Sequence, residues 1–436
     1  MKFRNSDILT LLLLTAPAAL LQSCTYHDKV IINERHEIVI GVASAGTKSI
    51  IDNEDGSERL ADMVKQCFNG NGTLKENAGF GVFGFKKVIE TSSFLFDNQL
   101  VHPDLTSYTA NAAAHTEQYT DWVYSPLRFW DLTASYQFIG YWPYAPTPAD
   151  LSNPGTGFYV TTSVPENSTQ IDDTHKQIIL HNVPNWQLVD GTENDIMTAT
   201  SVGRYNPDYS FLGSVRMSFR HVLSQLVVKA YYVGTNVNNT GGVEIQGITL
   251  GKSDPITVTN EQTHEQSTVT VQVLGGGTDN TPASASESTD FKQRYDDDNP
   301  IALTNENGDN TNTIDLVNSY TLPWNTSTPN KKIEFKDETK PNVEVTPTLV
   351  NRWLMIPHKW QKLKMTVDYQ VEANTACKSE PVEVTLGAEF DDYKTLPGKK
   401  YVITLLLNTS NGSVTVADVA VERWTTHEIE RTFYNW

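Results

Sequence analysis

Basic residues are scarce in this chain relative to acidic ones. Lysine and arginine together number 33 against 52 aspartates and glutamates, which gives a formal net charge of −19. Binding to phosphate backbones requires a positively charged surface, so this charge balance argues against a nucleic-acid partner. A net charge of this size instead favours solubility outside the cell.

Motifs that carry catalysis or hold metals are missing. The sequence contains no His-Glu-x-x-His zinc motif, no Gly-x-Ser-x-Gly elbow, no phosphate-binding loop and no Cys-x-x-Cys pair. The ten histidines are scattered, and the oxygen-rich runs 296–298 and 305–310 do not have the spacing of a known calcium loop. We therefore predict no catalytic residues, no cofactor and no metal site. A glycosidase is the weakest alternative, because nothing indicates a pair of catalytic carboxylates.

Cysteine is nearly absent, and the first of the three cysteines closes an N-terminal leader. A short basic lead precedes the apolar run 8–21, which ends in Leu21-Gln22-Ser23-Cys24. The run is too short to span a bilayer, so we interpret residues 1–23 as a secretory signal peptide. The ending resembles the lipobox of bacterial lipoproteins, which implies an acylated Cys24 anchored in the outer membrane. The alternative is an ordinary signal peptide with a chance cysteine.

The two remaining cysteines, Cys67 and Cys377, are far apart in the sequence. A disulfide between them is possible in an oxidising compartment, but two separate thiols are the favoured interpretation. No later segment is long and apolar enough to span a membrane, so the lipid would be the only anchor.

The rest of the chain has the pattern of an all-β protein. Short runs with period-two alternation recur from residue 37, and only 60–68 is expected to be helical. Alternation restarts at Val215 after a polar stretch, which indicates a domain boundary. We predict a tether at 24–36, an N-terminal β-sandwich domain at 37–214 and a C-terminal β-sandwich domain at 215–436. A polar insertion near 275–330 is expected to form a long loop.

Aromatic residues crowd between residues 122 and 144. Sugar-binding surfaces use exposed rings as stacking platforms, so the possible ligand-binding aromatics are Trp122, Trp130, Tyr141 and Trp142. Aromatic rings also fill the cores of β-sandwiches, and we favour core or loop packing over a binding platform here.

Several short motifs follow one another in an order that resembles the fimbrillin family, the subunits of type V pili of gut and oral anaerobes. These motifs are Ala45-Gly-Thr-Lys48-Ser49, Gly81-Val-Phe-Gly-Phe, Tyr141-Trp-Pro-Tyr144, the segment from Phe219 to Val228, Leu354-Met-Ile-Pro357, and Pro397-Gly-Lys-Lys-Tyr-Val-Ile-Thr-Leu with Trp424. The resemblance spans Glu37 to Trp424. It implies two transthyretin-like β-sandwich domains in tandem, export as a lipoprotein precursor, and assembly into a cell-surface fimbrium without catalysis.

The resemblance also implies how such subunits assemble. A trypsin-like or arginine-specific protease removes the first strand, and a strand from a neighbouring pilus subunit fills the groove, since that strand satisfies both the backbone groups and the apolar core. The cut must then follow the strand at 36–44, which disfavours Arg35 and leaves Arg59 and Lys48. Arg59 is slightly favoured, because relatives often carry arginine where this chain has Lys48.

The sequence leaves two alternatives open for the C-terminal region and two for the function. The C-terminal region Ser413–Trp436 could donate a strand to a neighbour, in a homo- or hetero-polymer, or complete its own sandwich. If neither Lys48 nor Arg59 is cut, the alternative is a surface glycan-binding or anchor or tip lipoprotein that does not polymerise. Adhesion to a host glycan or protein is compatible with both functions.

Overall fold

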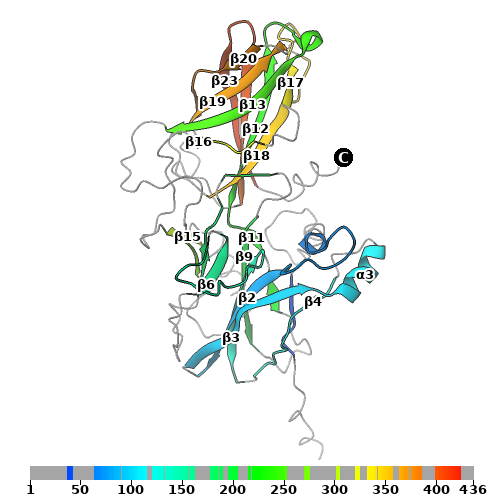
Figure 1. Ribbon diagram of the computed structural model, residues 1–436, viewed down its shortest axis with the longest axis vertical. Helices are drawn as coiled ribbons and strands as arrows, with labels where there is room; N and C mark the ends of the chain where they lie inside the picture. Colours follow the sequence, from blue (N-terminus) through cyan, green and yellow to red (C-terminus); the bar gives the residue numbers. More distant parts are fainter. Residues whose placement is uncertain are drawn as a thin grey trace, which may run out of the picture.

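The structure, a computed structural model, describes residues 37–42, 63–89, 91–114, 120–131, 133–155, 157–162, 177–184, 186–189, 195–204, 215–217, 219–252, 270–274, 301–304, 320–324, 331–340, 342–356, 363–372, 375–384 and 398–423. These residues form mainly β-strands in two bodies stacked along the longest axis (Figure 1). The predicted all-β class is confirmed. The division into two transthyretin-like domains stays a prediction. None of the helices in these ranges combines the length and hydrophobicity of a transmembrane span.

A six-stranded antiparallel sheet organises the first half of the chain. Its interior strand β2 begins Phe-Gly-Val-Phe-Gly-Phe and is buried on both faces. A strand covered on both faces has apolar residues at successive positions rather than at alternate ones, which accounts for this run. The strands, in spatial order, are β11 (Arg220–His221), β9 (Met197–Arg204), β5 (Ser135–Trp142), β2 (Phe80–Val88), β3 (Thr91–Pro103) and β4 (Trp122–Val123).

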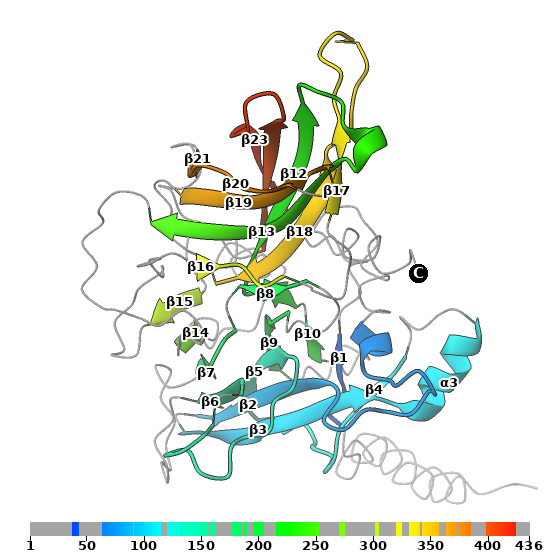
Figure 2. The ribbon, with the colours of Figure 1, turned by 45° about the horizontal axis from the view of Figure 1, so that its top comes forward.

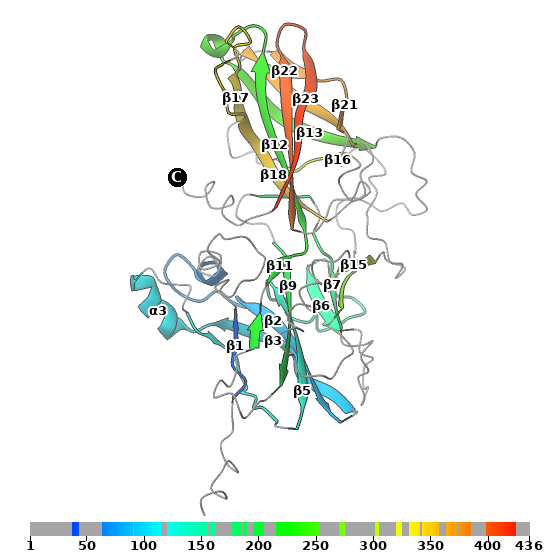
Figure 3. The same cartoon turned by 180° about the vertical axis from the view of Figure 1, so that it is seen from behind.

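One face of this sheet is covered by two short parallel strands, β1 (Ile40–Val42) and β10 (Val215–Met217). Figures 2 and 3 show the two strands side by side. The core beneath them combines Ile40 and Met217 with Phe80 and Phe138 of the sheet. Residues at the very start of the described chain are therefore needed to close this core.

The opposite face is covered by a four-stranded antiparallel sheet. In spatial order its strands are β15 (Ile301–Thr304), β14 (Thr270–Leu274), β7 (Gln177–His181) and β6 (Tyr159–Thr162). The core on this face joins Leu180 of β7 to Phe83 and Tyr141 of the large sheet. The strands β15 and β16 (Tyr320–Thr321) lie inside the segment 275–330 that the sequence predicts as a loop, so this expectation is corrected for residues 301–304 and 320–321.

The second half is a sandwich of eleven connected strands. One layer contains β8 (Gln187–Leu188), β18 (Thr348–Met355), β12 (Ser224–Val233), β22 (Lys399–Asn408) and β23 (Ser413–Arg423). The other contains β16 (Tyr320–Thr321), β13 (Val243–Lys252), β19 (Leu363–Val371), β20 (Thr375–Lys378) and β21 (Val382–Val384). The strand β17 (Lys331–Phe335) pairs with both β12 and β13 and so links the layers, and a 3-10 turn, η2 (Asn238–Thr240), follows β12.

The core of this sandwich explains the alternation of its strands. In β19, buried residues alternate with partly exposed ones from Leu363 to Tyr369. The buried set, including Met365 and Val367, packs against Leu226 and Val228 of the other layer. A strand with one face on a core and one face toward solvent has this period of two.

The two bodies share strands and core residues at their junction. Leu354 and Ile356 of the second half pack with Phe83 and Ile139 of the first half. The strand β10 pairs with β1 and β11 pairs with β9, so both belong to the first half, whereas β12 pairs with β18 of the second half. The chain therefore passes from the first body to the second between β11 and β12, and not at residue 215. The boundary at 214/215 stays a prediction, and the change of sheet lies slightly later in the chain.

One helix contradicts the expectation that no helix follows residue 70. The helix α3 (Leu105–Ala114) begins after Asp104, whose carboxylate Oδ2 accepts a hydrogen bond from the backbone N–H of Ser107 at 2.7 Å. Such a cap satisfies a backbone donor at the start of a helix. None of the helix residues is fully buried, so α3 lacks the apolar stripe by which an amphipathic helix is recognised in a sequence. In the predicted helical segment 60–68, residues 63–66 are helical.

Replacing Gly81 by alanine is expected to destabilise the first half. A Cβ at this position would lie 2.1 Å from the ring of Tyr141, its partner on β5. The ring is fixed because its hydroxyl donates to Asn98 Oδ1 at 2.5 Å. Overpacking of this kind costs about 1–3 kcal/mol of unfolding free energy, measurable by urea denaturation. Gly251→Ala in β13, where the nearest atom would lie 3.8 Å from the added Cβ, is the control. Equal losses of unfolding free energy in both variants would show that crowding against Tyr141 is not the cause.

Acidification below neutral pH is expected to weaken the fold through His181. Its ring stacks on Tyr159 with centroids 4.4 Å apart, and its Nε2 lies 2.8 Å from Thr161 Oγ1. Burial lowers the pKa of His181 from 6.5 to about 4. The unfolded chain therefore binds a proton between these values when the folded chain does not, so stability falls as pH drops from 6.5 toward 4. In His181→Phe, the fall of the urea midpoint between pH 6.5 and 4 should become smaller. If the midpoint falls with pH as steeply as in the wild type, His181 is not the group responsible.

Candidate functional site

The candidate functional site is the position of the β1 segment in the first core; this segment is residues 37–42, the strand β1 with the three residues before it. Ile38 and Ile40 are 0% and 1% exposed, whereas Val39 between them is 48% exposed. This is the alternation that the sequence predicts for 36–44, with one face directed into the core. Burial of two isoleucine side chains removes apolar surface from water and is the main attraction that holds the strand.

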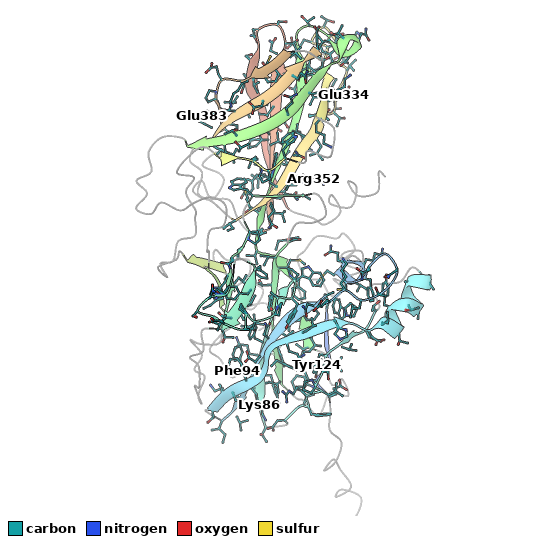
Figure 4. All side chains as sticks on the ribbon, viewed as in Figure 1. Lys86, Phe94, Tyr124, Glu334, Arg352 and Glu383 are labelled. Atoms are coloured by element: carbon teal, nitrogen blue, oxygen red, sulfur yellow. The ribbon has the colours of Figure 1, made fainter. Side chains whose placement is uncertain are left out.

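Hydrogen bonds from two different parts of the chain hold the backbone of this segment. On one side, Ile38 N–H donates to the carbonyl of Arg128 at 2.8 Å, and the Tyr124 hydroxyl donates to the carbonyl of Ile38 at 2.6 Å (Tyr124 is labelled in Figure 4). On the other side, the N–H of Val215 donates to the carbonyl of Val39 at 2.7 Å. The segment thus lies in a groove between the 124–129 loop and β10.

The groove determines what a replacement strand must provide. Without β1, the backbone groups of β10 and the 124–129 loop would lose their partners, and the core residues under Ile40 would meet water. An extended segment with two apolar side chains separated by one exposed residue would restore both kinds of contact. The arrangement can therefore bind a strand.

Apolar side chains at the surface lie next to this groove. Leu127 and Phe129 are 50% and 37% exposed, and they flank Arg128, whose carbonyl binds the β1 segment. Glu37 forms an antiparallel bridge with Phe129. Exposed apolar residues that gather at one place are typical of protein contact surfaces.

The comparisons with known proteins decide the family. A family model described as fimbrillin-like matches residues 68–424. The chain belongs to the fimbrillin-like family. Membership places it among fimbrial structural proteins rather than in an enzyme family. No curated protein matches the chain.

Solved structures similar to this fimbrillin-like chain come from Bacteroides and Porphyromonas species. A fimbrial protein from Bacteroides vulgatus has 15% identity and a TM-score of 0.49, with 90% of this chain and 100% of that chain covered. A candidate cell adhesion protein from Bacteroides uniformis has 12% identity and a TM-score of 0.37, with 89% and 99% covered. The tip fimbrial protein Mfa3 from Porphyromonas gingivalis, with a C-terminal truncation, has 9% identity and a TM-score of 0.31, with 80% and 95% covered.

Three residues predicted to act in export and processing lie outside the described ranges. They are the lipid-attachment residue Cys24 and the cleavage candidates Lys48 and Arg59. In the sequence, both cleavage candidates stand between β1 and the next described residue, Met63. Their roles stay predictions.

The aromatic residues considered for glycan binding lie mainly inside the fimbrillin-like fold. Tyr141 is fully buried, and Trp142 and Trp122 are 6% and 8% exposed. Trp130 is half-buried and meets Tyr136 edge to face, with ring centroids 4.8 Å apart. A ring can stack on a sugar only where its face is open, so the buried rings pack the core here and do not offer a platform.

The two later cysteines and one histidine are the remaining reactive side chains considered in the sequence. Cys67 and Cys377 form no disulfide, and burial raises the pKa of the Cys67 thiol to about 12. A thiol with such a pKa is protonated at neutral pH and is a poor nucleophile. His221, one of the scattered histidines, has its Nδ1 2.7 Å from Asp195 Oδ1. Sequence reasoning missed this pair because 26 positions separate the two residues.

The C-terminal region 413–436, a candidate donor strand, is described in its first part, where it pairs within its own chain. The strand β23 pairs with β22 along its whole length, from Ser413 to Arg423. Val414 is buried, and Val416 and Val419 pack at the edge of the second core. These residues therefore complete their own sandwich, while residues 424–436 lie outside the described ranges.

Shortening Ile40 is expected to destabilise the first half much more than shortening its exposed neighbour. Ile40→Ala removes buried atoms and leaves a cavity, with an expected loss of about 2–5 kcal/mol of unfolding free energy. Val39→Ala is the matched control and should change stability by less than about 0.5 kcal/mol. Urea denaturation followed by tryptophan fluorescence measures both variants. Similar losses in the two variants would show that β1 does not contribute one face to the core.

Proposed function

We propose that the protein is a structural subunit of a cell-surface fimbrium that assembles by strand exchange. It is exported as a lipoprotein precursor, held in the outer membrane by lipid on Cys24, and activated when a protease separates β1 from the rest of the chain. The observation that carries this proposal is the position of Ile38 and Ile40, which complete a core from a strand held at both edges by only a few hydrogen bonds. A strand from another subunit can replace β1 by making the same backbone hydrogen bonds and filling the same core positions.

The cleavage site follows from where β1 ends. A cut at Lys48 or Arg59 breaks the only covalent link between β1 and β2, whereas a cut at Arg35 leaves β1 attached and the groove filled. Arg59 suits an arginine-specific protease, and both sites suit a trypsin-like one. Release of β1 exposes apolar core and unpaired backbone groups, so polymerisation is the favourable response of the cleaved chain.

The incoming strand is constrained by the groove. It must run parallel to β10 and place two apolar side chains where Ile38 and Ile40 lie. Because β23 is paired with β22, a donor from the C-terminal region of this chain would come from residues 424–436. The alternative donor is a strand of a different pilus subunit. Exposed Leu127 and Phe129 beside the groove would add apolar contact area with the neighbour.

Limited digestion of the purified full chain with trace trypsin tests the proposal. We expect wild-type protein to be cut at Lys48 or Arg59, to lose β1, and to form ladders that resist detergent but dissociate on heating. The double variant Lys48→Ala/Arg59→Ala should remain monomeric. N-terminal sequencing of the ladders identifies the cut.

Arg35→Ala is the control for cleavage in front of β1, and it should assemble as the wild type does. Ladders whose first residue is Cys24, or ladders formed equally by the double variant, would contradict strand exchange. A chain that is cut and stays monomeric would favour the alternative of a non-polymerising anchor, tip or glycan-binding lipoprotein.

A further inference from the structure

Four asparagines of this chain stand directly before a glycine, the arrangement in which an asparagine side chain most readily loses ammonia. The pairs are Asn69-Gly70, Asn71-Gly72, Asn307-Gly308 and Asn411-Gly412. Glycine has no Cβ, so its backbone nitrogen can approach the preceding side chain closely. Asn307 lies outside the described ranges, and the fold treats the other three pairs differently.

The reaction consumes only water. The backbone nitrogen of the glycine loses its proton and bonds to Cγ of the asparagine, while the Cγ–Nδ2 bond breaks and Nδ2 takes up a proton and leaves as ammonia. The product is a five-membered succinimide ring, which water opens to aspartate or isoaspartate. Because the attacking nitrogen must give up its proton, any hydrogen bond that its N–H donates in the folded chain has to break first.

The fold protects Asn71 at both reacting groups. The N–H of Gly72 donates to the carbonyl of Asn69 at 2.8 Å. The side-chain oxygen Oδ1 of Asn71 accepts from the backbone N–H of Thr73 at 3.1 Å and from Thr73 Oγ1 at 2.7 Å. Ring closure requires these contacts to open, and each such hydrogen bond slows a step about two- to tenfold.

Asn411 is protected in the same way in the turn between β22 and β23. The N–H of Gly412 donates to the carbonyl of Asn408 at 2.8 Å. Asn411 Oδ1 accepts from the backbone N–H of Ser413 at 3.0 Å. The attacking nitrogen and the side chain are therefore both held here.

Asn69 stands at a different place in its turn. The hydrogen bond from Gly72 to Asn69 closes a four-residue turn, and a turn of this kind does not use the N–H of its second residue, Gly70. Within the described ranges this N–H has no hydrogen-bond partner. Gly70 is exposed, and an added Cβ would meet no atom within 4 Å. The side chain of Asn69 is held by an exposed hydrogen bond from Nδ2 to Thr73 Oγ1 at 3.0 Å.

We propose that Asn69 is a site of spontaneous deamidation in the folded protein, whereas Asn71 and Asn411 are protected by their turns. The product carries a new negative charge, and isoaspartate also lengthens the backbone by one methylene after residue 69. Phe68, the preceding residue, packs in the first core together with Ile38. The modification therefore changes charge and backbone length directly beside this core, and it does not depend on assembly.

Peptide mapping of the full chain tests the proposal. The protein is kept soluble in detergent and incubated at neutral pH in water enriched in the heavy oxygen isotope, which labels each new carboxylate. Electron-transfer fragmentation then separates position 69 from position 71 and aspartate from isoaspartate. The same chain unfolded in guanidinium chloride is the reference, since its asparagines lack the hydrogen bonds of the fold.

We expect Asn69 to react in the folded chain at close to its rate in the unfolded chain. Asn71 and Asn411 should each react about fivefold or more slowly in the folded chain than in the unfolded one, because their hydrogen bonds must open first.

Gly70→Ala separates the chemistry from the fold. Gly70 does not have the left-handed backbone conformation that would strain alanine, and its surroundings are open, so the variant is expected to fold as the wild type does. The added Cβ crowds ring closure and should slow deamidation of Asn69 about tenfold. Gly157→Ala is the matched control, because Gly157 has equally open surroundings and does not follow an asparagine. It should leave the rate at Asn69 unchanged.

Three outcomes would overturn the proposal. The first is that folding slows Asn69 as much as it slows Asn71. The second is that Asn71 or Asn411 reacts faster than Asn69 in the folded chain. The third is that Gly70→Ala deamidates at Asn69 as fast as the wild type.

Discussion

The first half of this protein depends on covering the apolar face of its six-stranded sheet with a strand from the start of the chain. Ile38 and Ile40 fill that core, but β1 gains only short stretches of pairing, with β10 and with the 124–129 loop. Burial and not the number of backbone hydrogen bonds therefore holds the strand. An element held mainly by side-chain burial can be replaced by another segment of similar pattern, and the proposed assembly by strand exchange rests on this property.

The second body supports the first through shared elements. The strand β8 pairs with β18, and Leu354 and Ile356 enter the core that also holds Phe83 and Ile139. The strands β14 and β15 follow β13 in the chain, yet β14 pairs with β7 of the first half. A force applied to one body is therefore transmitted through paired strands and packed side chains and not through a single linker. Such continuity suits a structural protein of a fimbrial family.

The sequence by itself determined the β class, the alternation of Ile38 and Ile40, and the order of motifs that indicates the fimbrillin family, which the match over residues 68–424 confirms. The first two features depend on local periodicity and composition, which can be read along the chain. The third is a resemblance of motifs in their order. The sequence also indicated that the aromatics near Trp142 would pack inside rather than lie open.

Tertiary structure alone decided which strands pair and which rings meet. The partner of β1 is more than a hundred positions away at β10, and Phe68 meets Tyr108, which lies about 40 positions later in the chain. Strands of equal alternation are compatible with many partners, so pairing is selected by the fit of the whole core and not by any one segment. The helix α3 escaped prediction for a related reason: its position depends on a cap at Asp104 and a ring stack, and not on an apolar stripe that the sequence would reveal.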